Sequence, residues 1–182
     1  MYNHSAASLE RFKAKVPVTT SISELAEADI YLLALRDDVI PEVAQALQNK
    51  NALVAHTSGS VALDAVNCER RGVFYPLQTF SKDKSMDYKN IPFCLEARHE
   101  SDLRLLKMVA NEVSGKAYEI DSEQRKKLHL SAVFVCNFVN HLYAIGEKVC
   151  QENDIPFEIL QPLIKETAEK IQNASAAGLQ TG

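Results

Sequence analysis

Tryptophan is absent from the 182-residue chain, glycine occurs only six times, and the four cysteines form no C-x-x-C pair. Cysteines this widely spaced fit neither a zinc site nor a disulfide scaffold, so we interpret them as reduced thiols of a cytoplasmic protein. The 20 Lys and Arg against 24 Asp and Glu give a net charge of −4. Because nucleic-acid binders are usually basic, no nucleic-acid partner is expected.

Long apolar runs are missing as well. His129, Asn137, Asn140 and His141 interrupt the most apolar stretch, residues 128–143. No uninterrupted run reaches the ~20 residues of a membrane span, so no membrane partner is expected. A hydrophobic content of 46% with 24% charged residues is typical of a globular protein.

Strand-like and helix-like patterns alternate as far as about residue 121. The run Ile30–Leu35 is apolar on both faces, as in a buried parallel strand. Further strands are expected at 52–55, 72–75, 91–96 and 117–120, with helices at 39–47, 61–66 and 101–113. Alternation of this kind predicts an α/β fold with a doubly wound, mostly parallel sheet. From Ser122 the pattern is helical, so we expect an α/β domain over 1–121 and an all-α domain over 122–182.

The glycine-rich turn of a dinucleotide-binding sheet is not found in this sequence. Such a turn lets the backbone approach the pyrophosphate at a helix N-terminus. The first glycine is Gly59, and no G-x-G-x-x-G occurs. Taken alone, this argues against a complete nucleotide-binding domain.

Several blocks of sequence, in a fixed order, point to a family. They are His56-Thr-Ser-Gly-Ser60, Phe74-Tyr-Pro-Leu-Gln-Thr-Phe-Ser-Lys82, Ser122-Glu-Gln-Arg125, Leu128-His-Leu130 and Phe134-Val-Cys-Asn-Phe-Val-Asn-His-Leu142. Together they resemble a bacterial family of NADP oxidoreductases with a Rossmann-like domain and a helical C-terminal domain of unknown function. Pyrroline-5-carboxylate reductase and 6-phosphogluconate dehydrogenase are its distant relatives.

The resemblance covers the whole chain and implies that the chain is truncated at both ends. In the family, a first strand, a glycine-rich loop and a first helix precede the segment that matches Tyr2–Ser5. About 30 residues, one strand–helix unit, are therefore expected before Met1. The segment Gln180–Gly182 resembles the start of a longer helical region. The resemblance thus implies a Rossmann-like sheet that lacks its first strand, and a chain that is inactive alone.

The resemblance also assigns candidate cofactor contacts. It places Asn3, His4 and Ser5 after the second strand, where the NADP phosphate is held; a simple helix cap is the alternative. Ligands of open sheets bind outside the carboxyl ends of the strands. Leu35, Arg36 and Asp37 should then lie beside the nicotinamide-side ribose. Asp37 or Asp38 is alternatively a helix cap.

The segment His56–Ser60, which follows the strand expected at 52–55, offers an imidazole, three hydroxyls and a flexible backbone. Histidine exchanges protons near neutral pH, and hydroxyls orient a carbonyl or imine. We expect His56, Thr57 and Gly59 to contact the cofactor, Ser58 to act in catalysis and Ser60 to contact substrate. The alternative is a capped loop with a structural histidine.

Polar side chains that follow the strand at 72–75 are candidates for substrate contacts: Gln78 and Thr79, with Ser81 close by. A hydrophobic hairpin or an interface is the competing interpretation of this segment.

The helical pattern that begins at Ser122 contains two polar residues eleven positions apart. At 100° per residue, His129 and Asn140 differ by only about 20° in direction, and Asn137 lies on a flank of that face. We expect His129 to be the general acid, Asn140 to assist it, and Asn137 to contact substrate. A buried hydrogen-bond network or a dimer seam explains the pattern equally well. The histidines lack metal-ligand spacing, so no metal is expected.

The combined hypothesis is an NADP-dependent oxidoreductase that transfers hydride to or from a C=N or C=O group of a small metabolite in an interdomain cleft. We expect a cytoplasmic homodimer that associates through its helical domain. The alternative is a non-catalytic binding or oligomerisation module on a Rossmann scaffold that has lost cofactor binding.

Overall fold

A computed structural model describes residues 1–80, 86–173 and 175–178 of the chain. The chain divides into two compact units, Met1–Leu130 and Ser131–Gly182. The domain boundary predicted at residue 121 lies at the start of a helix whose first turns contact the first unit. It therefore precedes the division between the compact units, and it stays a prediction.

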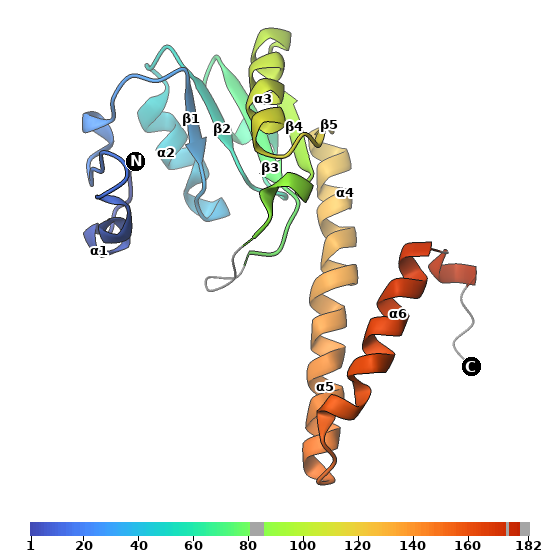
Figure 1. Ribbon diagram of the computed structural model, residues 1–182. Helices are drawn as coiled ribbons and strands as arrows, with labels where there is room; N and C mark the ends of the chain where they lie inside the picture. Colours follow the sequence, from blue (N-terminus) through green and yellow to red (C-terminus); the bar gives the residue numbers. More distant parts are fainter. Residues whose placement is uncertain (81–85, 174, 179–182) are drawn as a thin grey trace. The chain divides into compact units, whose positions relative to one another are not determined.

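The first unit is built on a five-stranded sheet (Figure 1). The strands lie in sequential order: β1 (Ile30–Leu33), β2 (Leu53–His56), β3 (Arg71–Pro76), β4 (Phe93–Ala97) and β5 (Ala117–Glu119). Three of the four strand pairs are parallel, and only β3 and β4 are antiparallel. The predicted mostly parallel α/β sheet is confirmed.

Helices cover both faces of this sheet: α2 (Ile40–Leu47) and α3 (Glu100–Val113). Successive residues of a strand point to opposite faces. Val54 of β2 accordingly packs in the core that contains α2, whereas its neighbours Leu53 and Ala55 pack in the core that contains α3. Two cores on opposite faces explain why Leu53, Val54 and Ala55 of β2 are all apolar, and they make the sheet doubly wound.

The N-terminal segment contains only short elements. A parallel bridge joins Tyr2 to Thr19, and it is followed by α1 (Ala6–Leu9). In the described part of the chain, 3₁₀ turns occur at Glu10–Phe12, Ile22–Glu24, Asp37–Val39, Leu63–Ala65, Tyr88–Asn90, Phe157–Leu160 and Ala176–Gly178. The helix predicted at 61–66 was wrong. Only the 3₁₀ turn forms there, because partners about 60 residues away in sequence bond the Val61 carbonyl and the Leu63 amide.

The helical region begins with α4 (Ser122–Ala132), continues through a π-helical segment, Val133–Phe138, and ends its first run with α5 (Val139–Glu152). A second helix, α6 (Gln161–Asn173), follows. The run Ser122–Glu152 is 31 residues long, and its most apolar 18-residue window has a mean hydropathy of 1.4 with no buried share. By length and composition alone, this helix could cross a membrane, although polar residues interrupt it.

Candidate functional site

The loop after β2 is folded by its own short polar side chains. Nδ1 of His56 accepts the Ser58 N–H at 3.2 Å. The Ser58 Oγ accepts the N–H groups of Ser60 and Val61, both at 3.1 Å. Such side-chain bonds to nearby amides replace a backbone turn. Ser58 therefore shapes the loop, and its catalytic role stays a prediction.

His56 has no exposed surface. Burial, and then the charge of Arg125, lowers the pKa of His56 to about 4, so the ring is neutral near pH 7. Because Nδ1 accepts a hydrogen bond, the proton lies on Nε2. Any cofactor contact at this position would have to use the backbone, and the predicted contact stays a prediction.

The carboxyl ends of β1 and β2 are tied together. The backbone N–H and the Oγ1 of Thr57 both donate to the Leu33 carbonyl, at 3.2 Å and 3.3 Å. The Ser60 hydroxyl donates to Oδ2 of Asp37. Three predicted site residues from two strands thus meet at one edge of the sheet.

The predicted cap at the start of α2 was wrong. Asp38 pairs with Arg36 at 2.9 Å instead, and no side chain caps α2. The 3₁₀ turn Asp37–Val39 intervenes, so the two carboxylates lie one turn ahead of the helix.

The first turns of α4 lie across the sheet face that carries Val73, Tyr75 and Glu96. Glu96 pairs with Val73 in the antiparallel register. The fully buried Arg125 bonds Glu96 Oε2 and the Val61 carbonyl, each at 2.5 Å. Ser122 completes the network, because its Oγ donates to Glu96 at 2.8 Å and accepts the Leu63 N–H at 2.9 Å. This network joins α4 to both the β2 loop and β4.

One helical turn after Arg125, His129 contacts the end of β3. Its Nδ1 lies 3.1 Å from the Tyr75 hydroxyl. Gly59 lies against both rings, since a Cβ on Gly59 would stand 2.7 Å from Nδ1 of His129 and 2.8 Å from Cζ of Tyr75. The structure therefore brings the predicted general acid to the same edge of the sheet as the loop after β2.

Other predicted site residues have local roles or are exposed. Oδ1 of Asn3 accepts the Ser5 N–H at 2.9 Å, which forms a turn before α1, and His4 is exposed. Oε1 of Gln78 accepts the Thr79 N–H at 2.8 Å. Leu35 is partly buried and packs against the core beside α2. Ser81 lies outside the described residues.

The spacing argument for the long helix was wrong. Between His129 and Asn140 lies the π-helical segment Val133–Phe138, whose wider turns break the count of 100° per residue. Asn137 lies within that segment, and both asparagines are exposed. Their predicted roles beside His129 stay predictions.

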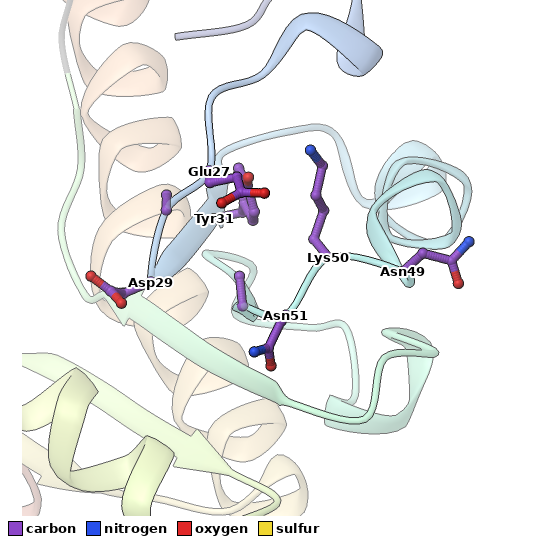
Figure 2. A pocket seen from close by; sticks show the side chains of 8 residues that line it. Glu27, Asp29, Tyr31, Asn49, Lys50 and Asn51 are labelled. Atoms are coloured by element: carbon purple, nitrogen blue, oxygen red, sulfur yellow. The ribbon is translucent and has the colours of Figure 1, made fainter.

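A pocket of about 470 Å³ lies at the opposite edge of the sheet (Figure 2). Glu27, Asp29 and Tyr31 line it before and within β1, and Lys50 and Asn51 line it before β2. These are the amino ends of parallel strands, whereas ligands of open sheets bind at the carboxyl ends. The pocket contains none of the predicted site residues.

Comparison with known proteins gives a family for this arrangement. A model of the domain of unknown function DUF2520 matches residues 91–182. A solved structure from Bacteroides fragilis, described as a "putative NADP oxidoreductase", is 39% identical with a TM-score of 0.88; the match covers 100% of this chain and 73% of that one.

The chain belongs to the DUF2520 family.

Two further solved structures share the fold. A protein from Thermotoga maritima is 23% identical with a TM-score of 0.80, over 100% of this chain and 73% of that one. Prephenate dehydrogenase from A. aeolicus, in complex with hydroxyphenyl propionate and NAD+, is 18% identical with a TM-score of 0.59, over 68% of this chain and 51% of that one. No match was found among curated proteins. The Rossmann-like fold predicted from the sequence is confirmed.

Only some of the residues that surround His129 lie within the range matched by DUF2520. Glu96, Arg125 and His129 lie inside the matched range, whereas Gly59 and Tyr75 precede it. Sequence reasoning missed Tyr75, Glu96 and Arg125 as site residues. The signal for Tyr75 and Arg125 was present, because both stand in blocks that carry the family resemblance. Their partners are far away in sequence, so their roles could not be read from spacing.

Proposed function

We propose that this chain carries the proton-donating half of an NADP-dependent oxidoreductase site, which acts on a C=N or C=O group of a small metabolite. The observation that supports this most is the position of His129, held by Tyr75 over Gly59 at the carboxyl edge of the sheet. The description of the 39% identical relative, "putative NADP oxidoreductase", supports the same reaction class.

The residues present fit one part of a nicotinamide cofactor. Asp37, Thr57 and Ser60 place a carboxylate and two hydroxyls at the ends of β1 and β2, and such groups bond ribose hydroxyls. The sequence contains no G-x-G-x-x-G, so we assign no residue to the pyrophosphate. The preference for NADP over NAD rests on the family relative and on the polar segment Asn3–Ser5.

The cofactor supplies the hydride when it is bound. The chain's own contribution is the proton. With Nδ1 engaged by Tyr75, His129 directs Nε2–H toward the substrate nitrogen or oxygen. In its imidazolium form, His129 gives this proton as negative charge develops there, and the ring, left as a neutral imidazole, then regains a proton from water. In the reverse direction, the same nitrogen accepts the proton.

Turnover of NADPH with a panel of small imines, ketones and aldehydes tests this function. We would use the chain joined to the part of the Bacteroides relative that the match does not cover. His129→Ala should lower kcat by about 10²–10⁴-fold, the usual contribution of a general acid. His141→Ala, an exposed histidine of α5, is the matched control. Equal turnover in the two variants would contradict the role of His129.

A second candidate function is a binding or oligomerisation module without catalysis. The missing glycine-rich sequence and the apolar surface of the helical unit favour it. Among the described residues of Ser131–Gly182, only Cys150 is a buried hydrophobic residue. A chain of this kind would bind neither NADPH nor NADH, which separates the two functions.

The partner that we propose for the helical unit is a second copy of the chain. A unit with almost no buried apolar side chains does not stabilise itself in water, so its apolar face requires a cover. Closed symmetric homodimers are the commonest solution. The polar residues within Ser122–Glu152 make a bilayer the less favourable cover. The net charge of −4 argues against a nucleic-acid partner, and the widely spaced cysteines fit a cytoplasmic protein.

A further inference from the structure

We infer that Tyr75 is a positioning residue: its hydroxyl holds the His129 imidazole in the tautomer that carries its proton on Nε2. This inference rests on the proposed function only where it names His129 the proton donor. The tautomer itself follows from contacts within the first unit and needs no cofactor.

The contact is geometrically specific. Tyr75 is the penultimate residue of β3, and its hydroxyl oxygen lies 3.1 Å from Nδ1 of His129. The two rings meet edge to face, with centroids 6.1 Å apart and planes inclined by 72°. Gly59 permits this approach, because a Cβ there would overlap both rings. Three separate segments therefore converge on one nitrogen of the imidazole.

The direction of the hydrogen bond follows from the chemistry of the phenol. Burial raises the pKa of the Tyr75 hydroxyl above its usual value, so the O–H stays protonated at neutral pH. A neutral imidazole has one accepting nitrogen and one N–H. A phenol O–H is a stronger donor than the N–H of a neutral imidazole, and an imidazole nitrogen is a stronger acceptor than a phenol oxygen. Nδ1 of the neutral ring is therefore expected to accept from Tyr75, with the ring proton on Nε2. No hydrogen bond to Nε2 of His129 is found in the described part of the chain, which leaves that N–H available to a ligand.

The phenol also suits both protonation states of the imidazole. A hydroxyl accepts as well as donates, so Tyr75 can accept from Nδ1–H when His129 is an imidazolium. The ring then keeps its orientation while the proton on Nε2 leaves and returns. A side chain that only filled space would not fix the tautomer.

Nitrogen NMR of the ¹⁵N-labelled chain tests the inference directly, since the two tautomers give different ring-nitrogen shifts. We expect His129 of the unaltered chain to show a protonated Nε2 and an unprotonated Nδ1. Tyr75→Phe should give a mixture of tautomers, whereas Tyr118→Phe, an exposed tyrosine of β5, should change nothing. A protonated Nδ1 in the unaltered chain, or an unchanged tautomer in Tyr75→Phe, would overturn the inference.

Kinetics separate this inference from the proposed function. In the active, extended chain, Tyr75→Phe should lower kcat by about tenfold or more with little change in KM, because only part of the general-acid contribution is lost. If His129→Ala leaves turnover unchanged, the proposed function fails while the tautomer result stands. If the tautomer is mixed in every chain while His129→Ala is inactive, only the role of Tyr75 fails.

Discussion

At the residue scale, His56 should make stability depend on pH. Its folded pKa of about 4 lies below the ordinary 6.5, so the unfolded chain binds more protons between these values. This contribution is complete above about pH 6.5 and is lost as the pH falls toward 4. We expect a loss of about 2 kcal/mol in unfolding free energy at a pH of about 5. Urea unfolding at several pH values measures it.

The control for His56 is a variant whose side chain does not titrate but still accepts the Ser58 N–H. His56→Asn can still accept the Ser58 N–H through its amide oxygen, so its unfolding free energy should change less between neutral and acidic pH. His4→Asn, at an exposed position, should behave like the unaltered chain. The same pH slope in all three chains would show that His56 is already charged when folded.

Gly59 provides a second residue-scale prediction. Its φ is not in the left-handed region, so the cost of Gly59→Ala comes from the contacts with His129 and Tyr75. We expect a loss of about 1–3 kcal/mol, typical of overpacking, together with loss of the Tyr75–His129 bond. Gly146→Ala in α5 is the matched control, because its Cβ would lie 3.9 Å from Phe157. That variant should gain about 0.5–1 kcal/mol in helix propensity. Equal effects in urea melts would contradict the close packing.

At the element scale, Arg125 fixes the start of α4 on the sheet. Its side chain is fully buried, and its partner Glu96 is 17% exposed. Arg125→Met leaves that carboxylate without its charge partner, so we expect a loss of about 3 kcal/mol, at the lower end of the range for broken buried pairs. Lys126→Met breaks an exposed pair with Glu123 and should cost less than about 1 kcal/mol. If thermal unfolding shows the same loss of stability in both variants, Arg125 does not hold the start of α4 on the sheet.

The elements themselves were largely predictable. Ile30–Leu33 and the first three residues of β2, Leu53–Ala55, are short apolar runs, and the pattern depends only on neighbouring residues. The failed helix at 61–66 and the uncapped α2 depend on partners elsewhere in the chain. Leu63 bonds Ser122, and Asp37 bonds Ser60. A local pattern cannot show which distant side chain takes a hydrogen bond.

The same limit applies to the candidate site. His129 was singled out because of its spacing from Asn140, and the π-helical segment removes that argument. The structure instead supplies Tyr75, which is 54 residues away in sequence. His129 was thus selected by a spacing that does not hold. Its partners could be found only once the fold had brought β3 and α4 together.

At the scale of the whole molecule, the helical unit should determine the oligomeric state. Leu142 of α5 and Leu163 of α6 are each 63% exposed in the single chain. We expect a dimer in light scattering, and a monomer when both residues are changed to lysine. Met108→Lys on α3, 66% exposed, should remain a dimer. A monomeric unaltered chain, or one that partitions into lipid vesicles, would contradict this partner.

The measurement that tests the central claim most directly is calorimetric titration with NADPH and with NADH. It should be made on this chain and on an extended chain, joined to the part of the Bacteroides relative that the match does not cover. The account predicts that the extended chain binds NADPH and binds NADH more weakly. If neither chain binds either nucleotide, the oxidoreductase account is contradicted, and the non-catalytic module takes its place.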